Sequence, residues 1–234
     1  MKAPLPANEQ ARLAALESYR ILDTAPEQAY DDIVAIATFI CDTPIATVTL
    51  VDEKRQWFKS QTGLTTRAGP REHAFCAHTI LDVNLMEVPD ASQDTRFAKN
   101  PLVLGDPHIR FYAGAPLVTA EGLSLGSVCV IDREPRKLTD AQKSALERLA
   151  HLTMNNLELR RVSTELAAAT ANVKTLSGML PICAWCKEIR DDAGYWQKVE
   201  TYISEHTNAE FSHGMCPTCQ AKMIADIKRQ SSGA

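Results

Sequence analysis

Residues 45–60 read IATVTLVDEKRQWFKS, and they carry a strong strand signal. The first half, from Ile45 to Val51, is rich in β-branched residues, which favour the extended conformation. Asp52 to Arg55 is a polar turn signal, and Gln56 to Ser60 reads as the returning strand. This stretch therefore predicts an antiparallel β-hairpin.

Helices are predicted on the N-terminal side of this hairpin. Apolar residues recur at helical spacing from Asn8 to Leu22 and again from Glu27 to Cys41, where Pro44 ends the second helix. On the C-terminal side, a short helix is compatible with Arg71 to Leu81, and a short strand with Leu85 to Val88.

A second hairpin is predicted further along the chain. Its strands run from Phe111 to Val118 and from Leu125 to Ile131, around the turn at residues 121–122. The polar stretch before it is punctuated by proline and glycine at residues 101–107, and long loops of this kind often cover a site. The order of elements predicts an α+β fold, with helices packed on a face of an antiparallel sheet.

A long helix is predicted to begin at Thr139, because Thr139 and Gln142 match a capping box. No Pro or Gly occurs between Thr139 and Ser177, and Gly178 stands where a C-terminal cap is expected. Two heptad positions predict a coiled-coil seam with a second copy of the chain, in which Asn155 fixes the register. They hold Leu152, Leu159, Leu166, Val173 and Leu180, and Asn155, Val162, Ala169 and Leu176. The alternative is a long amphipathic helix that lies on its own domain.

Four of the seven cysteines fall in two C-x2-C pairs in the last fifth of the chain. Two such turns can aim four thiolates at one point, the usual arrangement for structural Zn²⁺. The predicted ligands are Cys183, Cys186, Cys216 and Cys219, and His213 could replace one thiolate or donate to a sulfur. The alternative is a reduced redox motif, which two pairs without a βαβ pattern disfavour.

Charge and hydropathy exclude several classes of protein. The chain has 234 residues and a formal net charge of −4, which argues against a nucleic-acid binder with a broad basic face. The first ten residues lack the apolar stretch of a secretory signal, so we expect a cytoplasmic protein. The apolar run from Ile33 to Val51 is interrupted at residues 42–44, so it predicts a helix, a turn and a strand, not a membrane span.

Several longer motifs resemble a GAF domain of the kind found at the front of bacterial sensor kinases and cyclic-dinucleotide enzymes. They are LESYRILDTAPEQAYDDIVAIA from Leu16, VTLVDEKRQWFKSQTGL from Val48, AFCAHTIL from Ala74, VPDASQDTRFAKNPLV from Val88, and IRFYAGAPL from Ile109 followed by GSVCVID. The resemblance implies a six-stranded antiparallel sheet with a ligand pocket on one face, flanking helices that dimerise, and a trailing helix that transmits a signal.

The resemblance also implies where a ligand would lie. The pocket is expected between the sheet and residues 75–78 and 90–112, and its candidate lining residues are Phe75, Cys76, His78, Asp90, Phe111 and Tyr112. Each has a structural alternative: the aromatic rings could be core residues, His78 could bond to a backbone carbonyl, and Asp90 could cap a turn. The identity of the ligand is left open.

Three regions follow from these motifs. Residues 1–136 are expected to form the GAF-like sensory domain with its N-terminal helix, residues 137–178 the long signalling helix, and residues 179–234 a small zinc-binding module. The stretch from Leu180 to Cys219 resembles a module that follows sensor and receiver domains in other bacterial proteins.

The leading hypothesis is a non-enzymatic bacterial signalling protein. Its GAF domain would sense a small molecule or redox state, a homodimer formed by the flanking and long helices would relay the change, and the zinc module would contact a protein partner. After Ile131 the sequence has no phosphate-cradling glycine-rich loop, His kinase box or cyclase motif. No membrane partner is expected.

Two alternatives belong to other classes. A free methionine sulfoxide reductase, a GAF-fold thiol enzyme, would use Cys76, but the motif around that family's attacking cysteine has no match in residues 105–110. A zinc-dependent nucleic-acid-binding regulator would need clustered positive charge, whereas residues 182–234 hold six basic against seven acidic side chains. The sequence therefore favours a protein partner over a nucleic acid.

Overall fold

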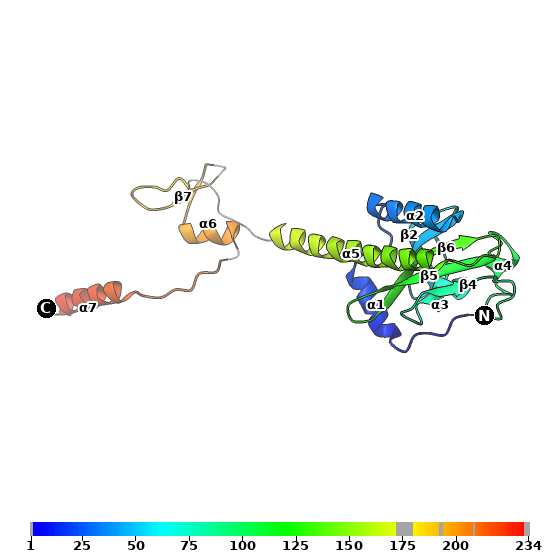
Figure 1. The fold of residues 1–234 in the computed structure, drawn as a ribbon. Coiled ribbons are helices and arrows are strands. Elements are labelled where there is room, and N and C mark those ends of the chain that lie inside the picture. Colours follow the sequence, from blue (N-terminus) through cyan, green and yellow to red (C-terminus); the bar gives the residue numbers. More distant parts are fainter. Residues whose placement is uncertain (1, 172–179, 192–193, 208, 232–234) are drawn as a thin grey trace. The chain divides into compact units, whose positions relative to one another are not determined.

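Six strands pair into one antiparallel sheet in the computed structural model, which describes residues 2–171, 180–191, 194–207 and 209–231 (Figure 1). The strands are β1 (Ile45–Val51), β2 (Arg55–Thr62), β3 (Ala68–Pro70), β4 (Met86–Val88), β5 (Phe111–Val118) and β6 (Ser124–Asp132). Their order across the sheet is β3-β2-β1-β6-β5-β4, and all neighbours run antiparallel. The six-stranded sheet and both predicted hairpins are confirmed.

Helices cover both faces of this sheet. Those on the first face are α1 (Glu9–Ser18), α2 (Gln28–Cys41) and α5 (Asp140–Ala171), and those on the second are α3 (Cys76–Thr79) and α4 (Pro101–Leu104). Because successive side chains of a strand point to opposite faces, each face has a core of its own. In β5, Phe111 belongs to the first core and Tyr112 to the second.

The segment from residue 71 to 81 differs from the predicted single helix. It begins with one 3-10 turn, η1 (Arg71–His73), and α3 starts only at Cys76. Ala74 between them has extended backbone angles, which interrupt the helix. The short elements β3 and α4 were not predicted, because three or four residues are too few to show a periodic pattern.

Helix α5 begins with the predicted capping box. The amide of Thr139 donates to Oε1 of Gln142, and the amide of Gln142 donates to Oγ1 of Thr139. The helix continues for 32 residues, about 48 Å at 1.5 Å per residue. Its predicted end at Gly178 lies outside the described residues.

The two sides of α5 differ in burial. Leu146, Leu149 and Leu157 are packed in the first core, whereas Leu152, Leu159 and Val162 are exposed. The early turns of the helix therefore lie on their own domain, as the alternative prediction had it. The exposed side holds the predicted heptad residues, and their pairing in a coiled coil stays a prediction.

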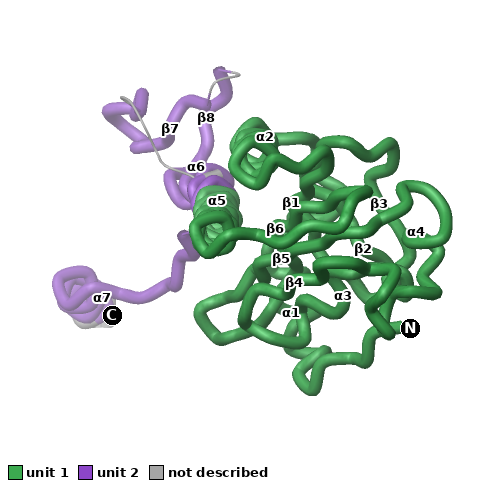
Figure 2. Tube along the Cα trace, turned by 45° about the vertical axis from the view of Figure 1, so that its right-hand side comes forward, with its two compact units in different colours: residues 1–165 green, residues 166–234 purple. Residues whose placement is uncertain are grey.

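The chain divides into two compact units, residues 1–165 and residues 166–234, which are green and purple in Figure 2. The second unit contains the paired strands β7 (Ile189–Arg190) and β8 (Trp196–Gln197), followed by α6 (Val199–His206) and α7 (Pro217–Ser231). Among the described residues, no helix combines the length and apolar character that crossing a membrane requires.

Candidate functional site

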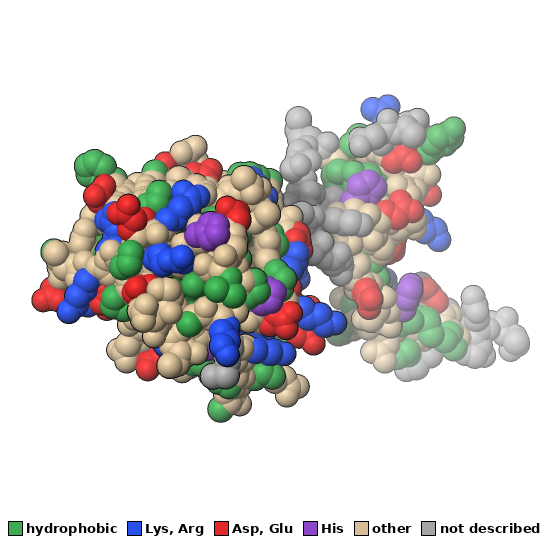
Figure 3. All heavy atoms as spheres, turned by 90° about the vertical axis from the view of Figure 1, so that its right-hand side faces the viewer, with side chains coloured by type: hydrophobic (Ala, Val, Ile, Leu, Met, Phe, Trp, Pro, Cys, Tyr) green, Lys and Arg blue, Asp and Glu red, His purple; other side chains and the backbone are tan. Residues whose placement is uncertain are grey.

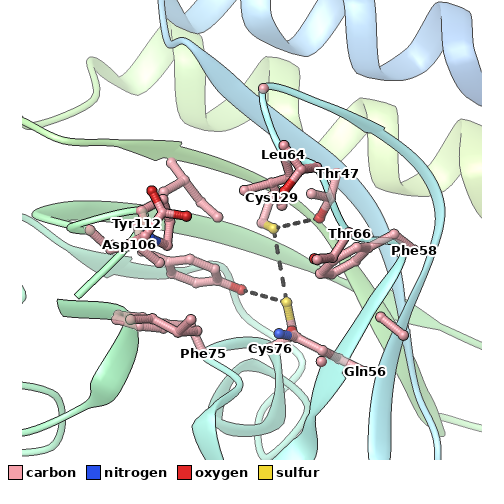
Figure 4. A pocket seen from close by; sticks show the side chains of 18 of the residues that line it. Thr47, Gln56, Phe58, Leu64, Thr66, Phe75, Cys76, Asp106, Tyr112 and Cys129 are labelled. Atoms are coloured by element: carbon pink, nitrogen blue, oxygen red, sulfur yellow. Dashed lines mark hydrogen bonds between the residues drawn. The ribbon is translucent and has the colours of Figure 1, made fainter. Parts of the chain in front are cut away.

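A cavity of about 360 Å³ lies on the sheet face that α3 and α4 cover (Figure 4). Side chains of β1, β2, β5 and β6 form its floor, and these are Thr47, Gln56, Phe58, Tyr112, Cys129 and Ile131. Its walls come from residues 63–70 and 106–109, from Cys76 of α3 and from Leu102 of α4. This volume lies in the range of pockets that bind small molecules.

Two thiols meet in this cavity. Cys76 begins α3 and Cys129 lies in β6, yet their Sγ atoms are 3.9 Å apart (Figure 4). The hydroxyl of Tyr112 donates to Cys76 Sγ across 3.5 Å, and Thr47 Oγ1 lies 3.1 Å from Cys129 Sγ. Both cysteines are buried. The sheet thus holds a small polar cluster beneath largely apolar walls.

Hydrogen bonding shifts the pKa values of the two thiols in opposite directions. Hydrogen bonds from Cys129, Ser127 and Tyr112 lower the pKa of the Cys76 thiol, against the opposing effect of burial. The same contact with Cys76, together with burial, raises the pKa of Cys129 well above its usual value. Burial and the charge of Cys76 also raise the pKa of Tyr112, so its hydroxyl stays protonated. Cys76 is therefore the thiol that ionises first.

Three of the six predicted lining residues, Phe75, Cys76 and Tyr112, line this cavity. The ring of Phe75 also stacks on Phe97 with 4.0 Å between the centroids, so it has the packing of a core residue as well. The role of these three residues in binding a ligand stays a prediction.

The other three predicted residues do not contribute to the lining. Phe111 belongs to the opposite core, because strand alternation turns it away from Tyr112. His78 packs edge-on against Phe97, with 4.8 Å between the ring centroids. Asp90 accepts hydrogen bonds from the amide and the hydroxyl of Ser92, so it caps a turn, as its structural alternative had it.

Sequence reasoning missed Cys129, Gln56 and the wall segment 63–70 as parts of the site. A signal for Cys129 was present: in GSVCVID, alternation places Ser127 and Cys129 on one face of the strand and the valines on the other. Segment 63–70 carries no such signal, because a loop has no period to read.

The C-terminal cysteines form two close pairs. The amide of Cys219 donates to Cys216 Sγ at 3.4 Å and lowers the pKa of that thiol, and the amide of Cys186 lowers the pKa of Cys183 in the same way. Each turn therefore favours a thiolate at its first cysteine, and the contact with Cys183 raises the pKa of Cys186. The described residues contain no group of three or more His, Cys, Asp or Glu side chains that could hold a metal ion. The turns fit two half-sites, and their assembly around one Zn²⁺, with or without His213, stays a prediction.

One face of the molecule mixes charges of both signs. On the face drawn in Figure 3, basic and acidic side chains lie next to one another around small apolar patches. This distribution agrees with the formal net charge of −4. A mixed surface of this kind does not concentrate the positive potential that attracts phosphates.

Comparison with known proteins gives a family and a relative. The sequence matches the GAF domain family over residues 20–157. A cyclic di-GMP phosphodiesterase of Pseudomonas aeruginosa is 46% identical over 159 residues, which make up 68% of this chain and 27% of the relative. The chain therefore spans little more than a quarter of the length of that relative.

Solved structures of GAF domains match this chain at low sequence identity. The GAF domain of an Acinetobacter phosphoenolpyruvate-protein phosphotransferase matches with a TM-score of 0.50 and 16% identity, covering 68% of this chain and 97% of that one. The PixJ GAF domain of Thermosynechococcus elongatus matches with a TM-score of 0.47 and 15% identity, covering 62% and 89%. The first of these likenesses concerns the fold alone.

One prediction is contradicted by these findings. The sequence predicted a protein that is not an enzyme, but the relative that shares 46% identity is named as an enzyme. The prediction rested on the lack of known catalytic motifs after Ile131. That reasoning was insufficient, because it considered only motifs already recognised in other output domains.

Proposed function

The chain belongs to the GAF domain family, and we propose that it is a sensory protein of cyclic di-GMP signalling. In this proposal a small molecule enters the cavity beside α3. Its binding changes a cyclic di-GMP phosphodiesterase activity, which belongs either to this chain or to a partner that the chain regulates. The cavity is the observation that carries the sensory part of the proposal. The 46% identity to a cyclic di-GMP phosphodiesterase supports the choice of signalling pathway.

The chemistry of the lining supports an organic ligand. Phe58, Phe75 and Ile131 offer apolar surface, whereas Gln56 and Tyr112 offer polar groups at the floor. Small-molecule sites are usually of this composition, mostly apolar with a few fixed polar groups that orient the ligand. We therefore expect a ligand with a flat or apolar body and one or two hydrogen-bonding groups.

A chain of ionic contacts supports the relay of binding to α5. Phe58 of β2 lines the cavity, and the next residue, Lys59, is buried on the other face of the strand. Lys59 Nζ lies 2.5 Å from Oε1 of Glu27, just before α2. The same Oε1 accepts from Arg160 of α5 at 3.0 Å. A displacement of β2 by a ligand would therefore act on α5 through Glu27.

The function is tested by measuring cyclic di-GMP in a bacterium that makes this nucleotide and expresses the full chain. We expect the wild-type chain to change the cellular level relative to the empty vector. Leu102→Trp fills the cavity and is expected to abolish that change. Leu104→Trp, in the same short helix but 67% exposed and away from the cavity, is the matched control and should act like the wild type.

Equal cyclic di-GMP levels with vector and wild-type chain would contradict the proposed function. Equal effects of the two tryptophan variants, both shown to be folded by circular dichroism, would contradict the role of the cavity. Hydrolysis of cyclic di-GMP by the purified chain, followed by chromatography of the linear product, determines whether the activity resides in this chain or in a partner that it regulates.

We further propose that the chain forms a homodimer through α2 and α5. The side chain of Gln142 donates to the carbonyl of Ile40, which brings the two helices together. Exposed apolar side chains lie on both helices: Ile36, Phe39 and Ile40 on α2, and Leu152, Leu159 and Val162 on α5. Exposed apolar side chains on two neighbouring helices support an interaction surface there.

Light scattering after size exclusion tests the dimer. The wild-type chain should have twice the mass of one chain, and Leu159→Glu should halve it, because the charge would be buried in the interface. Leu104→Glu, at an exposed site outside this surface, should stay dimeric. A wild-type chain that elutes as a monomer would contradict the dimer.

We also propose that one Zn²⁺ joins the two cysteine pairs of the second unit. A segment of about 50 residues buries little apolar surface, so a metal would supply much of its folding free energy. Elemental analysis should give one zinc per chain, and Cys216→Ser should lose it, whereas Cys41→Ser should keep it. No zinc in the purified chain would contradict this assignment.

A further inference from the structure

The contact between Cys76 and Cys129 joins two elements that are far apart in the sequence. The first residue of α3 and the middle of β6 are separated by 53 positions, and their Sγ atoms lie 3.9 Å apart, close to van der Waals contact. The side chains point toward one another, Cys129 from the floor of the cavity and Cys76 from its wall (Figure 4). A disulfide bond is about 2.05 Å long, so the two sulfurs would have to approach by about 1.9 Å to form one.

The surroundings of this pair favour a reactive thiolate at Cys76. The Tyr112 hydroxyl donates to Cys76 Sγ, and it is itself held by Thr79 Oγ1 at 2.7 Å and by Ser127 Oγ at 3.4 Å. Hydrogen bonds to a thiolate stabilise its charge, and the thiolate is the form of cysteine that attacks electrophiles. Cys129, whose proton is held more tightly, is placed to donate to the Cys76 thiolate and to react second.

The cavity gives a small oxidant a path to this pair. Cys76 and Cys129 both line it, and its rim includes Thr65, Thr66 and Asp106, which are exposed. A peroxide is far smaller than a volume of about 360 Å³. A large reagent, by contrast, meets two cysteines whose own surface is buried.

We propose that Cys76 and Cys129 form a peroxide-reactive dithiol, which hydrogen peroxide oxidises to an intramolecular disulfide. The Cys76 thiolate attacks one peroxide oxygen, so that an S–O bond forms and the O–O bond breaks. The second oxygen leaves as hydroxide and takes up the proton that Cys76 released. Cys76 is then a sulfenic acid.

The second step closes the disulfide. The sulfur of Cys129 attacks the sulfur of Cys76, an S–S bond forms, and the S–O bond breaks. The hydroxyl group leaves with the proton of Cys129 as water. In total the two thiols lose two electrons and two protons, and one hydrogen peroxide is reduced to two molecules of water.

Such a disulfide would couple oxidation to the cavity. It ties the start of α3 to β6 and removes the thiolate that accepts from Tyr112, so the floor on which a ligand would rest changes. The site would therefore respond to oxidation as well as to a ligand. It is independent of the proposed cyclic di-GMP function, because disulfide formation needs no phosphodiesterase activity.

Peptide mapping of the full chain tests this proposal. The reduced protein is exposed to hydrogen peroxide, denatured in iodoacetamide to block free thiols, digested, and examined by mass spectrometry. We expect a cross-linked pair of peptides that contain Cys76 and Cys129, which dithiothreitol separates. Cys41 is the internal reference and should remain alkylated, because burial raises the pKa of its thiol to about 11.

Two variants test the order of the steps. Cys129→Ser should stop the reaction at the Cys76 sulfenic acid, which dimedone traps, and Cys76→Ser should leave Cys129 unoxidised. If either variant does not fold, the peptide map of the wild-type chain still tests whether the disulfide forms. Full alkylation of both cysteines, irreversible oxidation of Cys76 without a cross-link, or a disulfide between either one and a different cysteine would each overturn the proposal.

Discussion

Tyr112 connects the polar groups of the cavity floor. Its hydroxyl contacts Cys76, Thr79 and Ser127 at 3.5, 2.7 and 3.4 Å, and its ring lines the cavity. It reaches this position because the preceding residue, Phe111, takes the other face of β5. One residue therefore links the chemistry of the thiol pair to the shape of the site.

Tyr112→Phe is expected to make Cys76 less reactive. A hydrogen bond to a charged group contributes about 1.5 kcal/mol or more, so its loss should raise the pKa of Cys76 by about one unit from its value of about 6. At about pH 5, below both pKa values, alkylation of Cys76 by iodoacetamide should therefore slow about tenfold, because the thiolate is the reacting form. Tyr30→Phe is the matched control, since the Tyr30 hydroxyl has no hydrogen-bond partner among the described residues and faces the first core. Equal rates of Cys76 alkylation in the two variants would refute the role of Tyr112.

Glu9 is expected to stabilise the fold in a pH-dependent way. Burial disfavours its charge, but hydrogen bonds from Arg12 and Arg71 outweigh burial and lower its pKa from 4.5 to about 2. A carboxylate with a lowered pKa contributes stability that is fully present above its unfolded pKa and is lost as the pH falls toward 2. Urea unfolding should therefore show Glu9→Gln less stable than the wild type at pH 7, with the difference vanishing near pH 2. A difference that does not depend on pH would show that the charge of Glu9 is not responsible.

At this scale, the sequence identified only part of the site. The resemblance pointed to Phe75, Cys76 and Tyr112, which do line the cavity. It could not show that Cys129 lies against Cys76, because that contact depends on the register of β6 against β1 and on the position of α3. A cysteine distant in sequence becomes a partner only through the fold.

Among the elements, β2 touches both the cavity and the segment that leads into α2. Its residue Lys59 is completely buried, and its Nζ donates to Thr24 Oγ1 at 2.9 Å, to the carbonyl of Ala25 at 2.7 Å and to Glu27 Oε1 at 2.5 Å. A buried ammonium group needs such partners to offset the loss of water. These contacts fix the segment between α1 and α2 to the sheet.

Lys59→Met is expected to destabilise the first unit by about 3 kcal/mol, because it leaves the carbonyl of Ala25 and one side of Glu27 without their donor. Arg160 still pairs with Glu27, which limits the loss. Lys54→Met, at an exposed position in the turn before β2, should change stability by no more than about 0.5 kcal/mol. Denaturant unfolding measures both variants, and equal midpoints would contradict the structural role of Lys59.

The elements that the sequence predicted are those with a clear period or cap. Residues 45–51 and 111–118 form strands with the predicted bounds, and Thr139 caps α5. The elements that it missed, such as β3 and α4, are held by tertiary contacts: β3 pairs with β2 over three residues, and Asn100 caps the start of α4. Short elements of this kind have too few residues to carry a pattern.

At the scale of the whole molecule, the sequence separated a sensory domain, a long helix and a cysteine-rich module. The structure divides the chain at residues 165 and 166, within α5, and the predicted boundaries stay predictions. The family match over residues 20–157 agrees with the α+β sheet. The prediction of a non-enzyme was wrong, because the lack of a familiar motif in the chain is weak evidence about activity.

The central claim is that the cavity binds a small molecule, and native mass spectrometry of the freshly purified full chain tests it most directly. The wild-type chain and Leu104→Trp should both carry an additional small-molecule mass, and Leu102→Trp should carry none, because its indole ring occupies the cavity. The same bound mass on all three proteins, or no bound mass on the wild type after incubation with an extract of bacterial metabolites, would contradict the claim.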